Sequence, residues 1–166
     1  MSNEEETKKF SSPACSAHEM DDRYMGFAGR EELLLALNEL LEAERAGALV
    51  TLRTVRQLTD PAFETLITAI HHDEARWCAM LTELIKNLGG TPSQKIGAFN
   101  EKAMAINDIP SRLIFLNRGQ AWVVRKLEAL LSTVRDDHIH AALKGMLISH
   151  QRNIDLVKSN TAEPNI

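Results

Sequence analysis

The sequence predicts an all-α fold, a four-helix bundle in which the helices run up, down, down and up. Four long segments repeat apolar residues at intervals of three and four, the pattern of amphipathic helices. Short turns join the first segment to the second and the third to the fourth, but residues 91–108 separate the second from the third. Antiparallel neighbours usually join through a few residues. The long connection therefore crosses the bundle and places the third helix parallel to the second.

The composition is that of a single globular domain. The chain has 166 residues, of which 44% are hydrophobic and 25% charged, and this length can bury a core without disulfides or metals as staples. A net charge of −4 and an aromatic content of 5% argue against the basic patches and stacking platforms of nucleic-acid-binding proteins. No apolar run is long enough to cross a bilayer. The sequence therefore predicts neither nucleic acid nor a membrane as a partner.

The N-terminal sequence and the cysteines favour a cytoplasmic location. The first residues are acidic and then basic with no apolar segment after them, unlike a secretory signal. Cys15 and Cys78 lie far apart and do not form a disulfide framework. Cys78, beside Trp77, is expected as a small core residue. Near Cys15, the residues His18 and Glu19 could add ligands, but one Cys-x-x-His spacing without a second pair is a weak zinc signal.

Three parts are predicted along the chain: a partly disordered N-terminal arm at 1–29, the bundle at 30–158 and a polar tail at 159–166. The arm carries Tyr24, Met25 and Phe27, whose side chains favour burial over a bundle end or against a second subunit. A homodimer is therefore expected.

Start and stop signals separate the first two helices. The first helix follows Gly29 and is expected to end near Leu58. Asp60 suits the N-cap and Pro61 the first position of the second helix. That helix is predicted to end at the glycine pair 89–90, because glycine is common just after a helix C-terminus.

The second half of the bundle has similar signals. The crossover contains a short helical segment at 98–106, and Asp108 caps the third long helix. A turn at 135–137 leads to the fourth helix, whose apolar stripe runs from Ile139 to Val157.

One polar residue interrupts each apolar stripe near the middle of its helix. These residues are Glu44, Glu74, Gln120 and His150, with His71 one turn before Glu74. A helix rises about 1.5 Å per residue, so the interruptions fall at similar heights and predict one polar layer inside an apolar core. A buried carboxylate or imidazole is costly without a partner. The layer must therefore supply its own partners or hold a ligand.

Metal binding is one interpretation of this layer. His71 and Glu74 stand three residues apart on the same helix face, so both can reach one point. With Glu44, Gln120 and His150 they form a candidate set of metal ligands. Their oxygen and imidazole donors suit iron or manganese, ahead of zinc, and no nucleotide cofactor is indicated.

Two other interpretations stay open. A network in which Arg45, Arg76 or Arg125 pairs with the buried glutamates explains the layer without a metal. The layer could also hold the carbonyl or carboxylate of a small molecule, which Arg76 or Arg125 turned inward would favour. The neighbouring His72 and Asp73 point away from the layer and are expected in solvent.

Several short runs resemble the ferritin and rubrerythrin-like superfamily. They are Asn38–Gly47, His71–Trp77, Leu88–Pro92 and Leu116–Gln120. More narrowly, the chain from Pro13 to Ile154 resembles a small bacterial family of uncharacterised ferritin-like proteins, whose members share the arm sequence around Cys15–Asp21. The resemblance implies a ferritin-like bundle.

The resemblance also implies a metal site, with departures. In that superfamily the four helices supply a glutamate, a Glu-x-x-His pair, a glutamate and a second Glu-x-x-His pair. Glu44 and His150 match this pattern, whereas the second helix has the reversed pair His71 and Glu74. Two positions that carry a glutamate in the superfamily hold other residues here, Gln120 and Leu147. The two glutamates and two histidines that remain suit one divalent ion better than two.

Two hypotheses about function follow. The first is a ferritin-like bundle of unknown substrate with a degenerate, mononuclear Glu/His metal site and redox activity. The second is a non-enzymatic structural or interaction bundle, in which a hydrogen-bond and salt-bridge network fills the former metal site. Whether the protein is an enzyme is open at this point.

Overall fold

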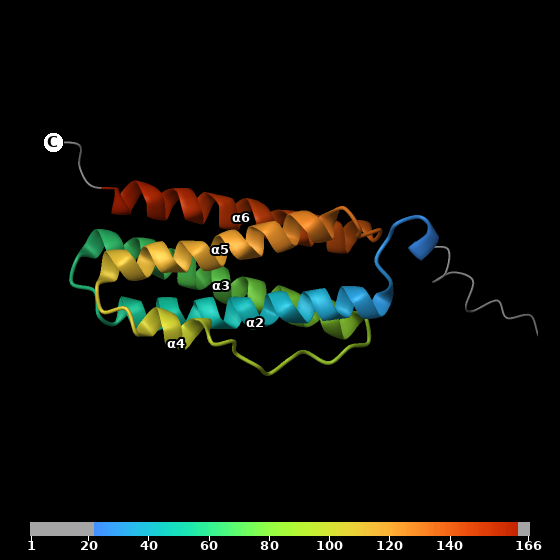
Figure 1. Cartoon of the computed structure of the whole chain (residues 1–166), viewed down its shortest axis with the longest axis horizontal. Coiled ribbons are helices and arrows are strands. Elements are labelled where there is room, and N and C mark those ends of the chain that lie inside the picture. Colours follow the sequence, from blue (N-terminus) through green and yellow to red (C-terminus); the bar gives the residue numbers. More distant parts are fainter. Residues whose placement is uncertain (1–21, 163–166) are drawn as a thin grey trace, which may run out of the picture.

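The computed structural model describes residues 22–162, in which a helical turn at 22–24 is followed by four long helices and one short helix (Figure 1). The elements are α2 (Arg30–Val55), α3 (Pro61–Asn87), α4 (Phe99–Met104), α5 (Ile109–Leu131) and α6 (Asp137–Thr161). Within this range there is no strand. None of these helices is both long and apolar enough to span a membrane.

The helices pack as the predicted bundle. α2 lies against α3 and α5 lies against α6, while α2 also contacts α5 and α3 also contacts α6. Figure 1 shows the crossover running back along the bundle from the end of α3 to the start of α5. Because the crossover spans the bundle, α3 and α5 run parallel and the up-down-down-up topology is confirmed.

The predicted helix starts are confirmed by their caps. The Asp60 side chain accepts a hydrogen bond from the Ala62 backbone N–H, with Pro61 in the first turn. Asp108 caps α5 in the same way. These aspartates satisfy backbone N–H groups that have no partner inside the helix. After α3, Gly89 has φ +72°, a left-handed conformation that favours glycine.

The boundaries differ from the prediction by a few residues where no cap is present. α2 ends at Val55 instead of near Leu58, because the backbone forms a turn with Leu58 N–H donating to the Val55 carbonyl. The short crossover helix is narrower than 98–106 and has no side-chain N-cap. Helix ends without a side-chain cap are weakly specified by sequence.

The extended part of the crossover is bound to α2 through Ser93. The Ser93 backbone N–H donates to the Asn38 side chain at 2.7 Å, and its hydroxyl donates to Glu42. The Arg45 guanidinium donates to the Ser93 carbonyl. Three side chains on successive turns of α2 therefore hold the crossover along the outside of the bundle.

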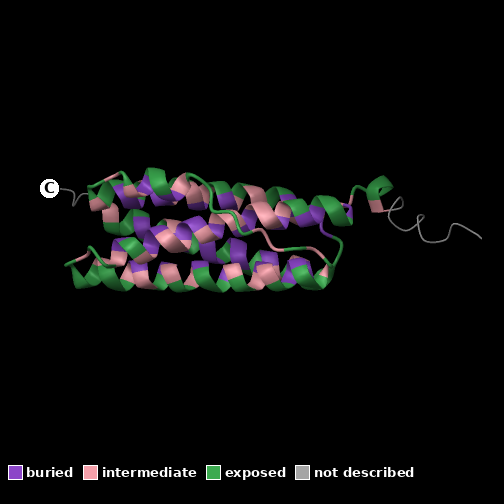
Figure 2. Ribbon diagram, turned by 90° about the horizontal axis from the view of Figure 1, so that it is seen from below, coloured by how far each residue is buried: buried purple, intermediate pink, exposed green. Residues whose placement is uncertain are grey.

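Buried residues lie along each of the long helices (Figure 2), and the apolar ones form two clusters. One contains residues from Leu33 to Leu41 on α2 with their neighbours on the other helices, and the other contains Val50, Ile67, Ile70 and residues packed against them. Glu44, Glu74, Gln120 and His150 are buried and fall between the two clusters in each helix sequence. The predicted polar layer is confirmed.

The described end of the arm contacts the turn between α5 and α6. Asp22 forms an ion pair with Arg135, and the Ala28 N–H donates to the Thr133 carbonyl at 2.9 Å. Tyr24 is 90% exposed, so the expectation that this side chain is buried over the bundle end is wrong for the single chain. Cys15, His18 and Glu19 lie outside the described residues.

Candidate metal centre

Three helices each contribute one buried ligand-type side chain to the centre of the layer. They are Glu44 on α2, Glu74 on α3 and His150 on α6. Each offers a ligand atom, and these atoms all lie within 4.8 Å of one another. Each side chain extends from a helix face that is apolar above and below, so the packing of the two core clusters fixes the height at which the three meet.

The His150 ring is held in a defined orientation. Its Nδ1 lies 3.1 Å from the Met146 carbonyl, and a carbonyl oxygen can only accept a hydrogen bond. Nδ1 therefore carries a proton in this contact, and a neutral ring presents the lone pair of Nε2. Nε2 lies 3.1 Å from Oε1 of Glu44. Metal-binding histidines commonly have this arrangement, with one nitrogen on a backbone carbonyl and the other on the ion.

Several buried polar atoms in the layer lack hydrogen-bond partners. The contact between His150 and Glu44 is close, but both carboxylate oxygens of Glu44 are without a hydrogen bond. Both amide atoms of Gln120 are also buried and unpartnered. Buried polar groups are almost always satisfied, and each unsatisfied one costs about 1–3 kcal/mol. The layer therefore has buried polar atoms on Glu44 and Gln120 that a bound ligand or added protons could satisfy.

The two glutamates favour the protonated state in the absence of a cation. Burial raises the pKa of Glu44 to about 8, offset in part by the adjacent Glu74 carboxyl, which lowers it, and with a further upward contribution from the charge of Asp73. Burial, followed by the charge of Glu44, raises the pKa of Glu74 well above its usual range, although His150 acts in the opposite direction. A bound cation would reverse this preference by stabilising both carboxylates.

Gly47 provides the space that the Glu74 carboxylate occupies. A Cβ at this position would lie 2.4 Å from Oε2 of Glu74 and 2.7 Å from its carboxyl carbon. Any other residue at position 47 would therefore displace the carboxylate. This glycine lies one turn after Glu44 on α2, so one helix supplies both a ligand-type side chain and room for a second. This role of Gly47 was not predicted from the sequence, because no sequence pattern marks a helical glycine against which a side chain of another helix packs.

His71 is not brought into this group. Its Nδ1 lies 3.1 Å from the Ala48 carbonyl and 3.2 Å from the Thr51 hydroxyl, and the side chain is half-buried. His71 thus faces α2 one turn away from Glu44 and Glu74. Gln120 does reach the layer, on the α5 side.

The arginines of the alternative network do not pair with the buried glutamates. Arg45 donates to the crossover, and Arg76 pairs with Asp73 at 2.8 Å and lies over the Trp77 ring at 4.3 Å. Arg125 makes no ion pair within residues 22–162. The predicted metal-free network, in which these arginines neutralise the buried glutamates, is therefore not formed.

Asp73 belongs to a second polar cluster, between α3 and α6. Its carboxylate accepts hydrogen bonds from Ser149 at 2.8 Å and Asn153 at 3.1 Å, and it pairs with Arg76 and Arg152. Burial opposes its ionisation, but these hydrogen bonds and charges outweigh burial and lower the pKa of Asp73. The expectation that Asp73 lies in solvent is wrong, since its side chain is 15% exposed.

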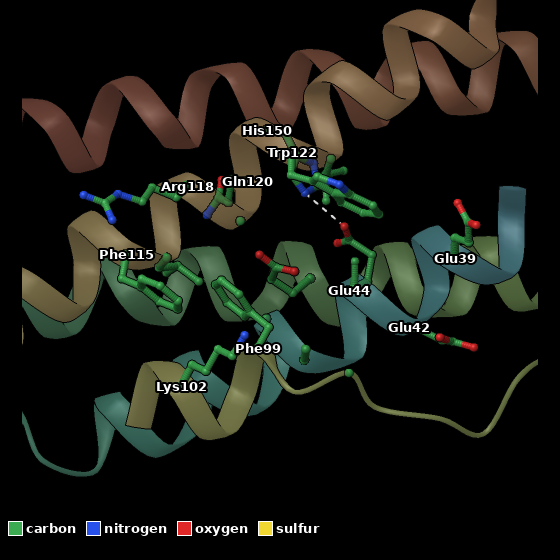
Figure 3. Close-up of a pocket in the computed structure, with 18 of the residues that line it drawn as sticks. Glu39, Glu42, Glu44, Phe99, Lys102, Phe115, Arg118, Gln120, Trp122 and His150 are labelled. Carbon is green, nitrogen blue, oxygen red and sulfur yellow. Dashed lines mark ion pairs between the residues drawn. The ribbon is translucent and has the colours of Figure 1, made fainter. Parts of the chain in front are cut away.

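A pocket of about 690 Å³ connects the polar layer to the surface (Figure 3). It lies between α2, α4 and α5, and Glu44, Glu74, Gln120 and His150 are part of its wall. The rest of the wall is mainly apolar and aromatic, with charged residues where it is exposed. No sequence pattern indicates this pocket, because it depends on how α4 packs against the long helices.

Comparison with known proteins places this arrangement in a family. Residues 31–159 match a family described as a domain of unknown function, DUF6306. The chain belongs to the DUF6306 family. No curated protein matches it.

Solved structures show that the DUF6306 chain has the ferritin-like fold. It is similar to a structure from Bacillus anthracis described as ferritin-like, diiron-carboxylate proteins, with a TM-score of 0.72 and 16% identity over 80% of this chain and 97% of that one. It is also similar to a two-domain protein from Anabaena variabilis with DJ-1/ThiJ/PfpI-like and ferritin-like domains. That match has a TM-score of 0.63 and 16% identity, and covers 87% of this chain and 43% of the other.

The donor atoms of the DUF6306 centre fit a divalent metal. Two carboxylates and one imidazole meet at one point, and no thiolate is among them. Such a set matches the ligand preferences of iron and manganese and also accommodates zinc. The unpartnered oxygens of Glu44 and the oriented Nε2 of His150 are the atoms that a cation would complete.

Proposed function

We propose that this DUF6306 protein binds one divalent transition metal, iron or manganese, at Glu44, Glu74 and His150 and uses it in redox chemistry on a small molecule. The observation that carries the proposal is the contact between His150 Nε2 and Glu44 Oε1 at 3.1 Å. Because Nδ1 donates to a carbonyl, this contact brings a lone pair toward a carboxylate. Two acceptors at this distance need a cation or a proton between them.

The number of donors supports one ion instead of two. Two carboxylates balance the charge of one divalent cation, and Gln120 and Leu147 stand where the resemblance to ferritins would place further glutamates. Three protein ligands leave positions for water or substrate, as in catalytic metal sites. We place the Gln120 amide beside the ion, where it would contact a bound ligand. We assign His71 no metal ligation; it stabilises the packing of α3 on α2.

The protein residues have separate tasks in this proposal. Bound iron or manganese would supply one-electron and Lewis-acid chemistry. Met146 holds the His150 ring so that Nε2 faces the centre, and Gly47 admits the Glu74 carboxylate. Glu44 and Glu74 must release their protons as the ion enters, so metal binding releases protons and strengthens with rising pH. The pocket beside the centre has a mainly apolar wall and gives a small molecule a route from the surface to the ion.

A metal-free interaction bundle is the competing function. One observation favours it: burial raises the pKa of both glutamates, so two protons held among Glu44, Glu74 and His150 would neutralise the layer without an ion. In that case the layer is structural. Replacing both glutamates by leucine would then leave the bundle folded and at least as stable, since apolar replacement of a buried polar group is often neutral or stabilising.

Metal analysis of the purified protein separates these functions. The protein is produced with added iron or manganese, dialysed, and measured by inductively coupled plasma mass spectrometry. The proposal predicts close to one ion per chain in the wild type and loss of the ion in Glu44→Gln and Glu74→Gln. A wild-type protein without metal, or equal metal in all three proteins, would contradict it.

A homodimer and a cytoplasmic location remain predictions. Tyr24 and Met25 are 90% and 66% exposed in the single chain, and burial of these side chains against a second copy would explain their apolar character. Light scattering during size-exclusion chromatography gives the mass in solution. Tyr24→Ser should lower the dimer fraction if the arm is the interface.

A further inference from the structure

The pocket that leads to the polar layer has the size and wall of a small-molecule site. Its volume of about 690 Å³ falls within the ~300–1,000 Å³ typical of ligand pockets. Its deep end is formed by buried residues of the polar layer, and its outer end lies among exposed residues of α4 and α5. A molecule in the pocket would therefore extend from solvent to the candidate metal centre.

The middle of the pocket is apolar. Phe99 and Phe115 stack with ring centroids 5.0 Å apart, and Trp122 adds a third aromatic side chain. Gly119 makes this packing possible, because a Cβ there would lie 2.6 Å from Cζ of Phe99. Aromatic walls of this kind favour an apolar body over water.

The outer end carries unpaired positive charge on one side. Figure 3 shows Lys102 and Arg118 toward one end of the pocket and Glu39 and Glu42 toward the other, with the Lys102 side chain extending toward Phe99 and the Arg118 side chain pointing outward. Glu39 pairs with Lys126 at 2.6 Å, and Glu42 accepts from the Ser93 hydroxyl.

Neither Lys102 nor Arg118 has an ion-pair partner in the part of the chain from residue 22 to 162. An anionic group would be bound on this side, because Lys and Arg provide charge-assisted hydrogen bonds to carboxylates.

At the inner end of the pocket, the Gln120 amide has no hydrogen-bond partner. Its side chain lines the pocket, is 3% exposed, and has neither its amide nitrogen nor its amide oxygen hydrogen-bonded. A buried amide in this state is costly. A polar atom on the inner end of a bound molecule would satisfy it.

We propose that the pocket binds a small organic carboxylate with an apolar body. The carboxylate lies at Lys102, with Arg118 adding positive charge at the same end of the pocket, the body lies along Phe99, Phe115 and Trp122, and the inner end reaches Gln120. The inner end of the bound molecule then lies beside Glu44 and His150. That this molecule is a substrate of the metal centre rests on the proposed function, whereas its binding in the pocket does not require the metal.

Calorimetric titration with octanoate, and with 1-octanol as its uncharged counterpart, tests the inference. The two probes share an apolar chain and differ in the charged end. Wild-type protein should bind octanoate roughly tenfold or more tightly than octanol, the effect of a charge-assisted hydrogen bond. The double variant Lys102→Glu/Arg118→Glu should lose this preference. The control Lys144→Glu/Lys158→Glu has the same charge change on exposed positions of α6 and should keep it.

Metal content measured on the same proteins distinguishes failure of this inference from failure of the proposed function. Lys102→Glu/Arg118→Glu should retain its metal, whereas Glu74→Gln should lose its metal and still bind octanoate. Octanoate binding that is absent, no tighter than that of octanol, or equally weakened in the α6 control would overturn the inference. Charge-dependent octanoate binding by a wild-type protein without metal would overturn only the metal function and the role of the carboxylate as its substrate.

Discussion

Two polar clusters lie at the same height of this bundle and differ in how well protein atoms satisfy them. The inner cluster is Glu44, Glu74, Gln120 and His150, and the outer cluster is Asp73, Arg76, Ser149, Arg152 and Asn153. Adjacent residues belong to different clusters, since Asp73 precedes Glu74 and Ser149 precedes His150. The clusters therefore share helices and register, and they differ in the face on which each side chain lies.

The outer cluster shows what a finished structural network looks like in this protein. Hydrogen bonds and arginine charges surround Asp73 and outweigh its burial, so its pKa is lowered. In the inner cluster burial dominates, the pKa of Glu44 is raised to about 8, and four carboxylate and amide atoms of Glu44 and Gln120 have no partner. The same chain thus supplies hydrogen-bond partners to the Asp73 carboxylate and leaves the polar atoms of Glu44 and Gln120 without them, a contrast that a ligand bound at the inner cluster would explain.

The largest expected contrast is between Glu74→Gln and Asp73→Asn. Both changes remove a carboxylate charge from neighbouring positions with little change in shape. Glu74→Gln should lower metal affinity by more than the roughly 10–100-fold typical of a lost outer-shell partner. Asp73→Asn should keep the metal and weaken folding by about 1–3 kcal/mol. Chelator competition and urea denaturation measure the two effects, and equal metal loss in both variants would remove the distinction between the clusters.

The pH dependence of stability should have opposite signs in the two clusters. The folded-state pKa of Glu44 is about 8, above its unfolded value of 4.5. The folded metal-free protein therefore binds the extra proton between these values, and its stability falls as pH rises through this window by up to about 1.4 kcal/mol per pH unit for one group.

The Asp73 contribution behaves in the opposite way. Its pKa is lowered from 3.8, so its stabilisation is present above that value and is lost as pH falls through the folded-state pKa. Urea denaturation of the metal-free wild type and of Glu44→Gln between pH 4.5 and about 8 isolates the contribution of Glu44 to stability. If the free energy of unfolding changes equally with pH in the two proteins, the raised pKa of Glu44 is contradicted.

Gly47→Ala tests the space in the inner cluster, with Gly145→Ala as its matched control in another helix. The new methyl group at position 47 would lie 2.4 Å from Glu74 Oε2, whereas nothing lies within 4 Å of a Cβ at position 145. Gly47→Ala should lower metal affinity and destabilise the protein by about 1–3 kcal/mol. Gly145→Ala should stabilise by about 0.5–1 kcal/mol. Thermal and urea denaturation give both values, and wild-type metal affinity in the Gly47→Ala variant would refute the packing argument.

Ser149→Ala should have the smallest effect. It removes one hydrogen bond of 2.8 Å from Asp73 and leaves Asn153 and two arginines in place. The expected loss is about 1 kcal/mol of folding free energy, with metal content unchanged. A change in metal content would show that the two clusters are coupled through α6.

The fold and the height of the polar layer were predictable because both depend on helix periodicity. Asp60 and Asp108 mark helix starts through local chemistry, and Glu44, Glu74, Gln120 and His150 interrupt apolar stripes at similar depths. The length of the crossover was enough to orient α5 relative to α3.

The rotation of each side chain about its helix was less predictable. His71 shares a helix face with Glu74, yet its ring bonds to Ala48 and Thr51 on α2 instead of joining the centre. Asp73 was expected in solvent, but its position toward α6 depends on how close α3 packs to that helix. The close approach at Gly47 and the pocket under α4 also arise from packing between distant segments, for which helix periodicity has no signal.

An anomalous difference map from crystals grown with manganese or iron tests the central claim most directly. The inner cluster should show one peak per chain within about 2.0–2.2 Å of carboxylate oxygens of Glu44 and Glu74 and of Nε2 of His150. Asp73 and its partners should show none. An inner cluster without a peak, in a protein that binds the ion elsewhere or not at all, would contradict the account and assign the layer to a metal-free network.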